Sequence, residues 1–161
     1  MHFTDYSGYK MAQNKNIEYR ELSNETVVEI AGNVSGFGGC SRGVCNTVVV
    51  APNTTITATA PYLFEECQIL REVHLGENCS FRGDNIFAGC SSLKTLNASD
   101  GLRFVGNATF AGCGFKELVI PKGTIIDGKY SFGECPGLVS VIIEDGVVIS
   151  GDETFKDCLG L

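Results

Sequence analysis

A phenylalanine followed three residues later by a cysteine recurs at a nearly constant interval along most of this chain. The steps between successive cysteines of this pattern are 27, 23, 23, 22 and 23 residues. A unit of this length cannot bury an apolar face alone, so neighbouring units are expected to stack and share one core. The spacing therefore predicts a solenoid. The pairs are Phe37/Cys40, Phe64/Cys67, Phe87/Cys90, Phe110/Cys113, Phe132/Cys135 and Phe155/Cys158.

Three apolar positions with the spacing L-x-x-L-x-L follow each cysteine. The last two alternate with another residue, which predicts a short strand. Phe87, Cys90 and Leu93 are spaced three apart, consistent with one helical or 3₁₀ turn before the strand. Phe115 comes one residue early, which accounts for the 22-residue step. The sets are Leu70/Val73/Leu75, Leu93/Leu96/Ala98, Phe115/Leu118/Ile120 and Leu138/Val141/Ile143, with a looser copy at Cys45/Val48/Val50.

A second apolar pair and then a glycine turn signal complete each unit. Stacked copies of such a unit are expected to form parallel ladders with about 4.8 Å between neighbouring strands. The second pairs are Thr54/Ile56, Cys79/Phe81, Leu102/Phe104, Thr124/Ile126 and Val147/Ile149, and the glycines are Gly83, Gly106, Gly128 and Gly151.

The combined pattern, Phe-x-x-Cys-x-x-Leu-x-x-Leu-x-Leu, resembles the BspA-like (Treponema pallidum-type) leucine-rich repeats. The copies at residues 86–93 and 108–113 match best, and the resemblance covers about residues 44–161. It implies a leucine-rich-repeat solenoid, mainly β, coiled right-handed, with short parallel strands and short helical or 3₁₀ turns. Such repeats occur in surface proteins of bacteria and parasitic protists, where they imply adhesion or binding of a host ligand. The fold does not identify the ligand.

Two segments are expected. Residues 1–25 are polar and show no repeat, which indicates an N-terminal extension or cap, and residues 26–161 form the solenoid. Leu161 is the first anchor of a new strand. Because a solenoid needs a cap over its last coil, we expect the repeat to be truncated there, or covered by a partner or sister chain.

Charge and hydropathy exclude several classes of function. The net charge of −7 lacks the basic footprint of a nucleic-acid-binding protein and is not attracted to anionic lipid headgroups. No apolar run approaches the roughly 20 residues of a membrane helix, so no membrane insertion is expected within this chain.

The eight cysteines contain no C-x₂-C pair of the kind that zinc sites use. Their phase with the repeat instead predicts small buried side chains stacked in the core, with no metal and no cofactor. A disulfide between Cys40 and Cys45, or between Cys45 and Cys67, stays an open alternative.

Catalysis is not expected, and no catalytic residue is assigned. The chain has two histidines, His2 in the polar segment and His74 on a strand, and the phased cysteines are expected to point away from His74. No phosphate-binding glycine loop, G-x-S-x-G or H-E-x-x-H motif is present.

The outward positions of the strands carry the candidate binding site. Val119 and Ile142 occupy equivalent positions in successive repeats, which places two exposed apolar side chains together, and such a patch often marks a contact site. The alternative is an ordinary solvated sheet surface. The predicted ligand-binding residues are His74, Asn97, Glu117, Val119, Ser140 and Ile142.

Six N-x-[ST] sequons suit a protein of the eukaryotic secretory pathway, although Asn, Ser and Thr are also common in turns. A glycan at Asn97 would occupy the proposed binding face. The expected location is the cell surface or the secreted fraction, with the cytoplasm as the alternative. The sequons begin at Asn24, Asn33, Asn53, Asn78, Asn97 and Asn107.

The sequence thus predicts a non-catalytic binding or adhesion module for a protein or glycan ligand, with a host surface as one candidate. Two alternatives remain. In the first, the chain is a structural segment that self-associates through its uncapped C-terminal edge, because an unpaired strand edge is a template for pairing. In the second, the chain is the repeat scaffold of a larger regulatory protein.

Overall fold

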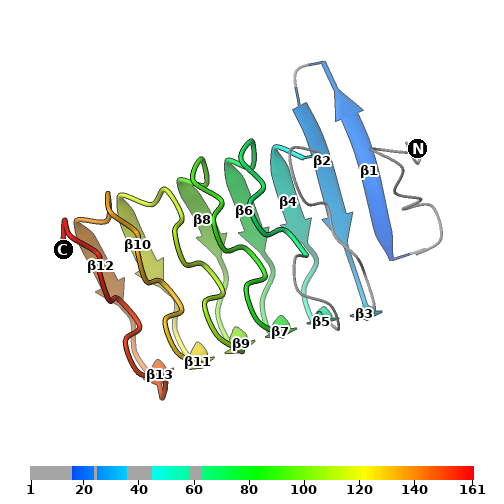
Figure 1. The fold of residues 1–161 in the computed structure, drawn as a ribbon. Coiled ribbons are helices and arrows are strands. Elements are labelled where there is room, and N and C mark those ends of the chain that lie inside the picture. The colour runs from blue at the N-terminus through cyan, green and yellow to red at the C-terminus, as the bar shows by residue number, and fades with distance from the viewer. Residues whose placement is uncertain (1–15, 24, 36–44, 59–62) are drawn as a thin grey trace.

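The computed structural model describes residues 16–23, 25–35, 45–58 and 63–161 (Figure 1). The described chain winds into a solenoid whose coils each contribute one strand to each of two faces. The longer strands form the broad face: β1 (Ile17–Leu22), β2 (Glu25–Ile30), β4 (Thr47–Val50), β6 (Glu72–Leu75), β8 (Thr95–Ala98), β10 (Glu117–Ile120) and β12 (Ser140–Ile143). The shorter strands form the narrow face: β3 (Asn33–Ser35), β5 (Thr55–Thr57), β7 (Ser80–Arg82), β9 (Arg103–Val105), β11 (Ile125–Asp127) and β13 (Val148–Ile149).

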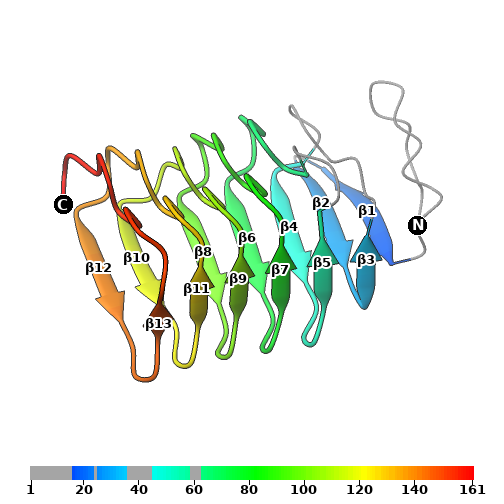
Figure 2. The same cartoon turned by 60° about the horizontal axis from the view of Figure 1, so that its bottom comes forward.

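Parallel pairing in the expected register joins most neighbouring coils. On the broad face Val48 pairs with Val73, and Val73 with Leu96. The narrow face is one unbroken sheet from β3 to β13 (Figure 2). The repeat-solenoid fold with parallel strands is therefore confirmed.

Phenylalanine rings stacked from coil to coil form the centre of the core. Successive ring centroids from Phe64 through Phe87, Phe110 and Phe132 to Phe155 lie 5.0, 5.0, 5.3 and 5.8 Å apart. The first four rings are fully or almost fully buried. Stacking at this separation is favourable for aromatic pairs, so the phased phenylalanines hold adjacent coils in register.

The expected helical or 3₁₀ turns are not confirmed, because the described residues contain no helix. Isolated bonds join Cys90 N to Phe87 O at 3.4 Å and Leu93 N to Cys90 O at 2.9 Å. The intervening amides point along the solenoid instead: Phe87 N donates to Thr109 O at 2.8 Å, and Gly89 N to Ala111 O at 2.7 Å. Pairing with the next coil uses the donors that a helix would need.

A close approach of successive coils explains the glycines that follow the narrow strands. A Cβ atom on Gly128 would lie 1.8 Å from the carbonyl oxygen of Gly106. No side chain fits at that separation, so the repeat requires glycine here.

The N-terminal end of the broad face is formed by an antiparallel pair. β1 runs against β2, with Ile17 opposite Ile30 and Leu22 opposite Glu25. Ile17 and Tyr19 are buried against the first coil. Residues 1–15, Asn24, Phe37 and Cys40 lie outside the described residues. The division of the chain between residues 25 and 26 stays a prediction.

The described cysteines are buried, as their phase predicted. Each repeat thiol donates to a carbonyl of the preceding coil; for example, Cys90 Sγ lies 3.1 Å from Phe64 O and Cys158 Sγ lies 3.1 Å from Phe132 O. Cys45 and Cys67 are not joined by a disulfide. A disulfide to Cys40 lies outside the described residues. The thiols thus serve as small core side chains that also satisfy backbone acceptors.

Candidate binding surface

All six predicted site residues lie on the broad face, where parallel pairing sorts them into two groups. His74 on β6 is in register with Asn97 on β8. On β10 and β12, Glu117 is opposite Ser140, and Val119 is opposite Ile142. Val119 is 44% exposed and Ile142 57% exposed, so the two form an accessible apolar pair. Their role in binding stays a prediction.

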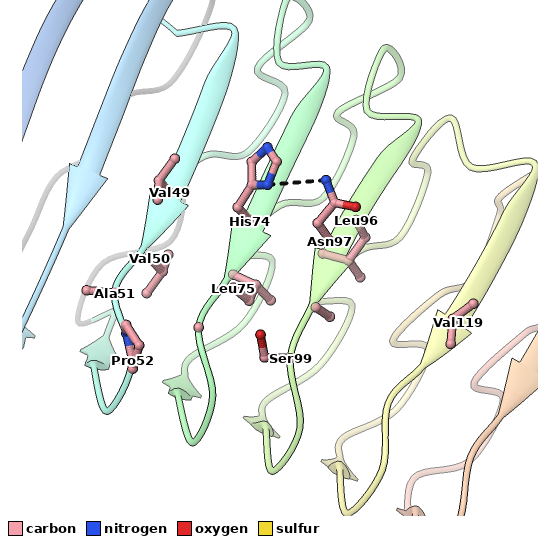
Figure 3. Close-up of a pocket in the computed structure, with 12 residues that line it drawn as sticks. Val49, Val50, Ala51, Pro52, His74, Leu75, Leu96, Asn97, Ser99 and Val119 are labelled. Atoms are coloured by element: carbon pink, nitrogen blue, oxygen red, sulfur yellow. Dashed lines mark hydrogen bonds between the residues drawn. The ribbon is translucent and has the colours of Figure 1, made fainter.

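The first group forms a polar relay across three side chains. Asn97 Nδ2 lies 3.2 Å from His74 Nδ1, and His74 Nε2 lies 3.1 Å from Glu72 Oε2 (Figure 3). Because an amide NH₂ can only donate, Nδ1 accepts and the proton is on Nε2, which donates to Glu72. The relay fixes the orientation of Asn97 and does not use its amide oxygen.

The hydrogen-bonded ladder of the broad face is interrupted between these two groups. β8 and β10 are fully described, yet no pairing joins them, and β10 and β12 form a separate two-stranded sheet. Figure 1 shows the wider separation of these two ribbons. On the narrow face of the same coils, β9 and β11 remain paired. The coils therefore part on the broad face alone.

A shortened turn before β10 is the first cause of the interruption between β8 and β10. Phe115 follows its cysteine by two residues instead of three, so the strand begins one residue early. The residue before a strand normally donates to the preceding coil: Lys94 N to Arg71 O at 3.2 Å, and Val139 N to Lys116 O at 2.8 Å. Lys116 N makes no such bond to Lys94 within the described structure.

A proline after β10 is the second cause. The residue after the strand donates to the preceding coil elsewhere: Ser99 N to Leu75 O at 2.9 Å, and Glu144 N to Ile120 O at 3.1 Å. Pro121 occupies this position in β10's coil. Proline carries no backbone N–H, so the bond cannot form. The hydrogen bonds that normally join a strand to the preceding coil are therefore missing at both ends of β10.

The interruption opens the core beside β8. Val73 on β6 and Leu118 on β10 are 0% and 3% exposed, as inward positions should be. Leu96, the equivalent residue of β8, is only partly buried, and so is Ala98. A crevice between β8 and β10 therefore has an apolar floor.

This crevice belongs to a trough that crosses four strands of the broad face (Figure 3). Its volume is about 600 Å³. One side is formed by His74 and Asn97, and Val119 stands beyond the crevice. The trough is lined by Val49, Val50, Ala51, Pro52, His74, Leu75, Gly76, Leu96, Asn97, Ala98, Ser99 and Val119.

Of the predicted site residues, His74, Asn97 and Val119 line the trough, whereas its other lining residues were not predicted from the sequence. Ala51, Gly76 and Ser99 follow successive strands and leave a row of small side chains. The 22-residue step and Pro121 were both visible in the sequence. Together they signal a weakened strand pair, whereas the row of small residues has no meaning until the strands are aligned.

Metal binding and thiol chemistry find little support in the described residues. Those residues contain no group of three or more His, Cys, Asp or Glu side chains arranged to hold a metal. Burial raises the pKa of the Cys90 thiol to about 12 and that of Cys113 well above its ordinary value. Thiols of this kind are poor nucleophiles, because the thiolate is the reactive form.

Several sequons lie at accessible positions. Asn33, Asn53, Asn78, Asn97 and Asn107 are exposed. No described segment forms a helix with the length and hydrophobicity needed to cross a bilayer.

Comparison with known proteins agrees with the repeat geometry. The model of the BspA type leucine-rich repeat region matches in six copies, over residues 10–127 and 57–161. The chain belongs to this family. Repeats of this kind generally serve as scaffolds for protein interaction rather than for catalysis.

A solved structure gives the same fold. The crystal structure of a leucine-rich repeat protein from Bacteroides ovatus is similar, with a TM-score of 0.60 and 22% identity. The similarity covers 92% of this chain and 45% of that protein, so the BspA-type chain spans less than half of its neighbour's length. At this identity the likeness concerns the fold alone. None of the curated proteins compared with the chain is significantly similar to it.

Proposed function

We propose that this chain is a non-catalytic adhesion or binding module, which presents the broad face to a protein or glycan ligand on a host surface or in the surrounding matrix. The observation that carries the proposal is the in-register pair Val119 and Ile142, exposed side by side. Exposed apolar side chains in contact with each other commonly mark an interaction site. The polar relay of His74 and Asn97 lies on the same face and supplies oriented hydrogen-bonding groups.

A cell-surface or secreted location is part of the proposal. It is supported by the occurrence of BspA-type repeats in surface proteins. Exposed sequons such as Asn53 and Asn107 are compatible with it, in a host that glycosylates them.

Binding to immobilised collagen, laminin and fibronectin, measured by biolayer interferometry, tests the proposal. A double variant, Val119→Lys with Ile142→Lys, should weaken any binding about tenfold or more, because it places two charges in the apolar contact. The matched control changes Val148 and Leu159 to lysine; these residues are 54% and 84% exposed and belong to no strand of the broad face. The control should bind as the parent protein does.

Two results would contradict the proposal. Binding to none of these proteins would remove the adhesion function. Equal losses in the face variant and in the control would show that binding does not involve the broad face.

Self-association through the last coil is a second candidate. The outer edge of β12 is unpaired in the described structure, and Ile143 and Leu161 are 51% and 57% exposed. Sedimentation velocity over increasing concentration would reveal such assembly. Ile143→Lys should then abolish it, and a purely monomeric protein at high concentration would refute it. A third possibility is that the chain is the repeat scaffold of a larger regulatory protein.

A further inference from the structure

We propose that the trough on the broad face is a peptide-binding site. It takes an extended segment of a protein ligand, with one aliphatic side chain in the crevice against Leu96 and with backbone groups bonded to Asn97 and to the edge of β8. This inference rests on the proposed binding function and names the ligand class and the point of contact.

Unpaired backbone acceptors at the crevice favour a peptide. Elsewhere on this face the carbonyl at the end of a strand accepts from the next coil, as Leu75 O does from Ser99 N at 2.9 Å. Pro121 cannot donate, so the carbonyl of Ala98 lacks this partner. The carbonyl of Lys94, just before β8 and outside the lining of the trough, also lacks the partner that Arg71 O has. Backbone acceptors of this kind are ordinarily paired, and a peptide N–H is their natural complement.

The floor of the crevice favours an aliphatic side chain on that peptide. Leu96 is partly exposed, although Val73, its partner in register, and Leu118, its equivalent on β10, are buried. Val119, 44% exposed, forms the far wall. An aliphatic group between them would remove apolar surface from water on both sides.

The trough has room for a backbone beside the crevice. The small residues Ala51, Gly76 and Ser99 leave space after the strands, and the open trough has a volume of about 600 Å³. Four strands at about 4.8 Å spacing cover the length of about four or five extended residues. Asn97, held by His74, points its amide group along the trough.

A glycan or a second copy of the chain fits these features less well. No Phe, Tyr or Trp lines the trough, so it offers no aromatic platform. The described strands of a second copy already use most of their backbone donors within their own ladders, except at the outer edges and at the facing edges of β8 and β10. A flexible segment of another protein has amide groups that are not paired in a ladder, so it can donate them without breaking existing hydrogen bonds.

Two synthetic pentapeptides provide the probes: acetyl-Gly-Ser-Leu-Ser-Gly-amide, and the matched peptide with glycine in place of leucine. Methyl NMR of protein labelled at leucine and valine reports on Leu96 and Val119 directly. We expect saturable shifts at both residues with the leucine peptide, and about tenfold weaker binding of the glycine peptide, since it lacks the side chain that fills the crevice.

Repair of the ladder provides the decisive variant. Pro121→Ala restores the missing N–H, and a serine inserted after Gly114 restores the 23-residue step found elsewhere. With β8 and β10 paired, the peptide shifts should disappear. Should the repaired protein fail to fold, Ser99→Phe fills the trough from an exposed position and should have the same effect. Pro136→Ala, at an exposed turn outside the trough, serves as the control.

Equal binding of both peptides, unchanged binding after Ser99→Phe, or the absence of shifts would overturn the inference. Shifts at Leu96 produced by chitotetraose and not by peptide would also overturn it. The proposed function fails separately: if matrix-protein binding depends on Val119 and Ile142 while the pentapeptides do not bind, the binding face stands and only the trough assignment falls.

Discussion

Replacing Phe110 with alanine probes the stacked core at its centre. The ring is fully buried and contacts rings on both sides along the solenoid. Truncation of a buried phenylalanine costs about 3–5 kcal/mol. Because the ring also lies in several aromatic pairs, each contributing about 0.5–1.5 kcal/mol, we expect a loss of about 5 kcal/mol. The centroid distances are 5.0 Å to Phe87, 5.3 Å to Phe132, 5.4 Å to Phe104 and 6.0 Å to Phe115.

Urea unfolding followed by circular dichroism measures this loss. With an m-value of about 2 kcal/mol/M, the midpoint should fall by about 2.5 M. Phe155→Ala is the matched control: its ring is only partly buried and stacks on Phe132 at 5.8 Å, so its loss should be smaller. Equal losses for the two variants, or a larger loss for Asn97→Ala than for Phe110→Ala, would refute the assignment of inward and outward positions.

Further predictions concern the surface, the thiols and the glycines. Asn97→Ala should change the free energy of unfolding by less than about 0.5 kcal/mol, since the side chain is exposed; thermal unfolding checks this. Native protein at pH 8 should resist alkylation by iodoacetamide at its described cysteines, and mass spectrometry should find them all labelled after unfolding, because they are buried. The contribution of Cys90 to the free energy of unfolding should be level below pH 9 and fall between pH 9 and 12, because burial raises the pKa of this thiol from 9.0 to about 12 and the unfolded chain loses the proton first; urea unfolding at several pH values checks this. Gly128→Ala should be far more destabilising than Gly137→Ala, since the added Cβ lies 1.8 Å from Gly106 O in the first case and 3.5 Å from Phe115 O in the second.

The interruption between β8 and β10 shows how a small sequence change alters one face of a repeat protein and spares the other. The coils remain joined through the phenylalanine stack and through β9 and β11. Loss of one turn residue and one N–H therefore opens a local crevice without unwinding the solenoid. The effect stays local because each coil of a repeat protein contacts only its neighbours.

The period of the Phe-x-x-Cys pattern was sufficient to determine the solenoid, the register of its coils and the side of each strand that faces the core. These properties follow from local spacing, because a recurring apolar position can be buried only by stacking on its copies. The burial of Val73 and the exposure of Val119 were predictable for the same reason.

Contacts between coils decided the rest. The segment from Phe87 to Leu93 has helical spacing, yet its amides pair with the next coil, and the sequence does not show which acceptor is nearer. The antiparallel β1 has no repeat to reveal it. The trough arises only where a short turn, Pro121 and a row of small residues from three coils lie side by side. None of these features opens a trough within its own repeat, because each acts through its pairing with a neighbouring coil.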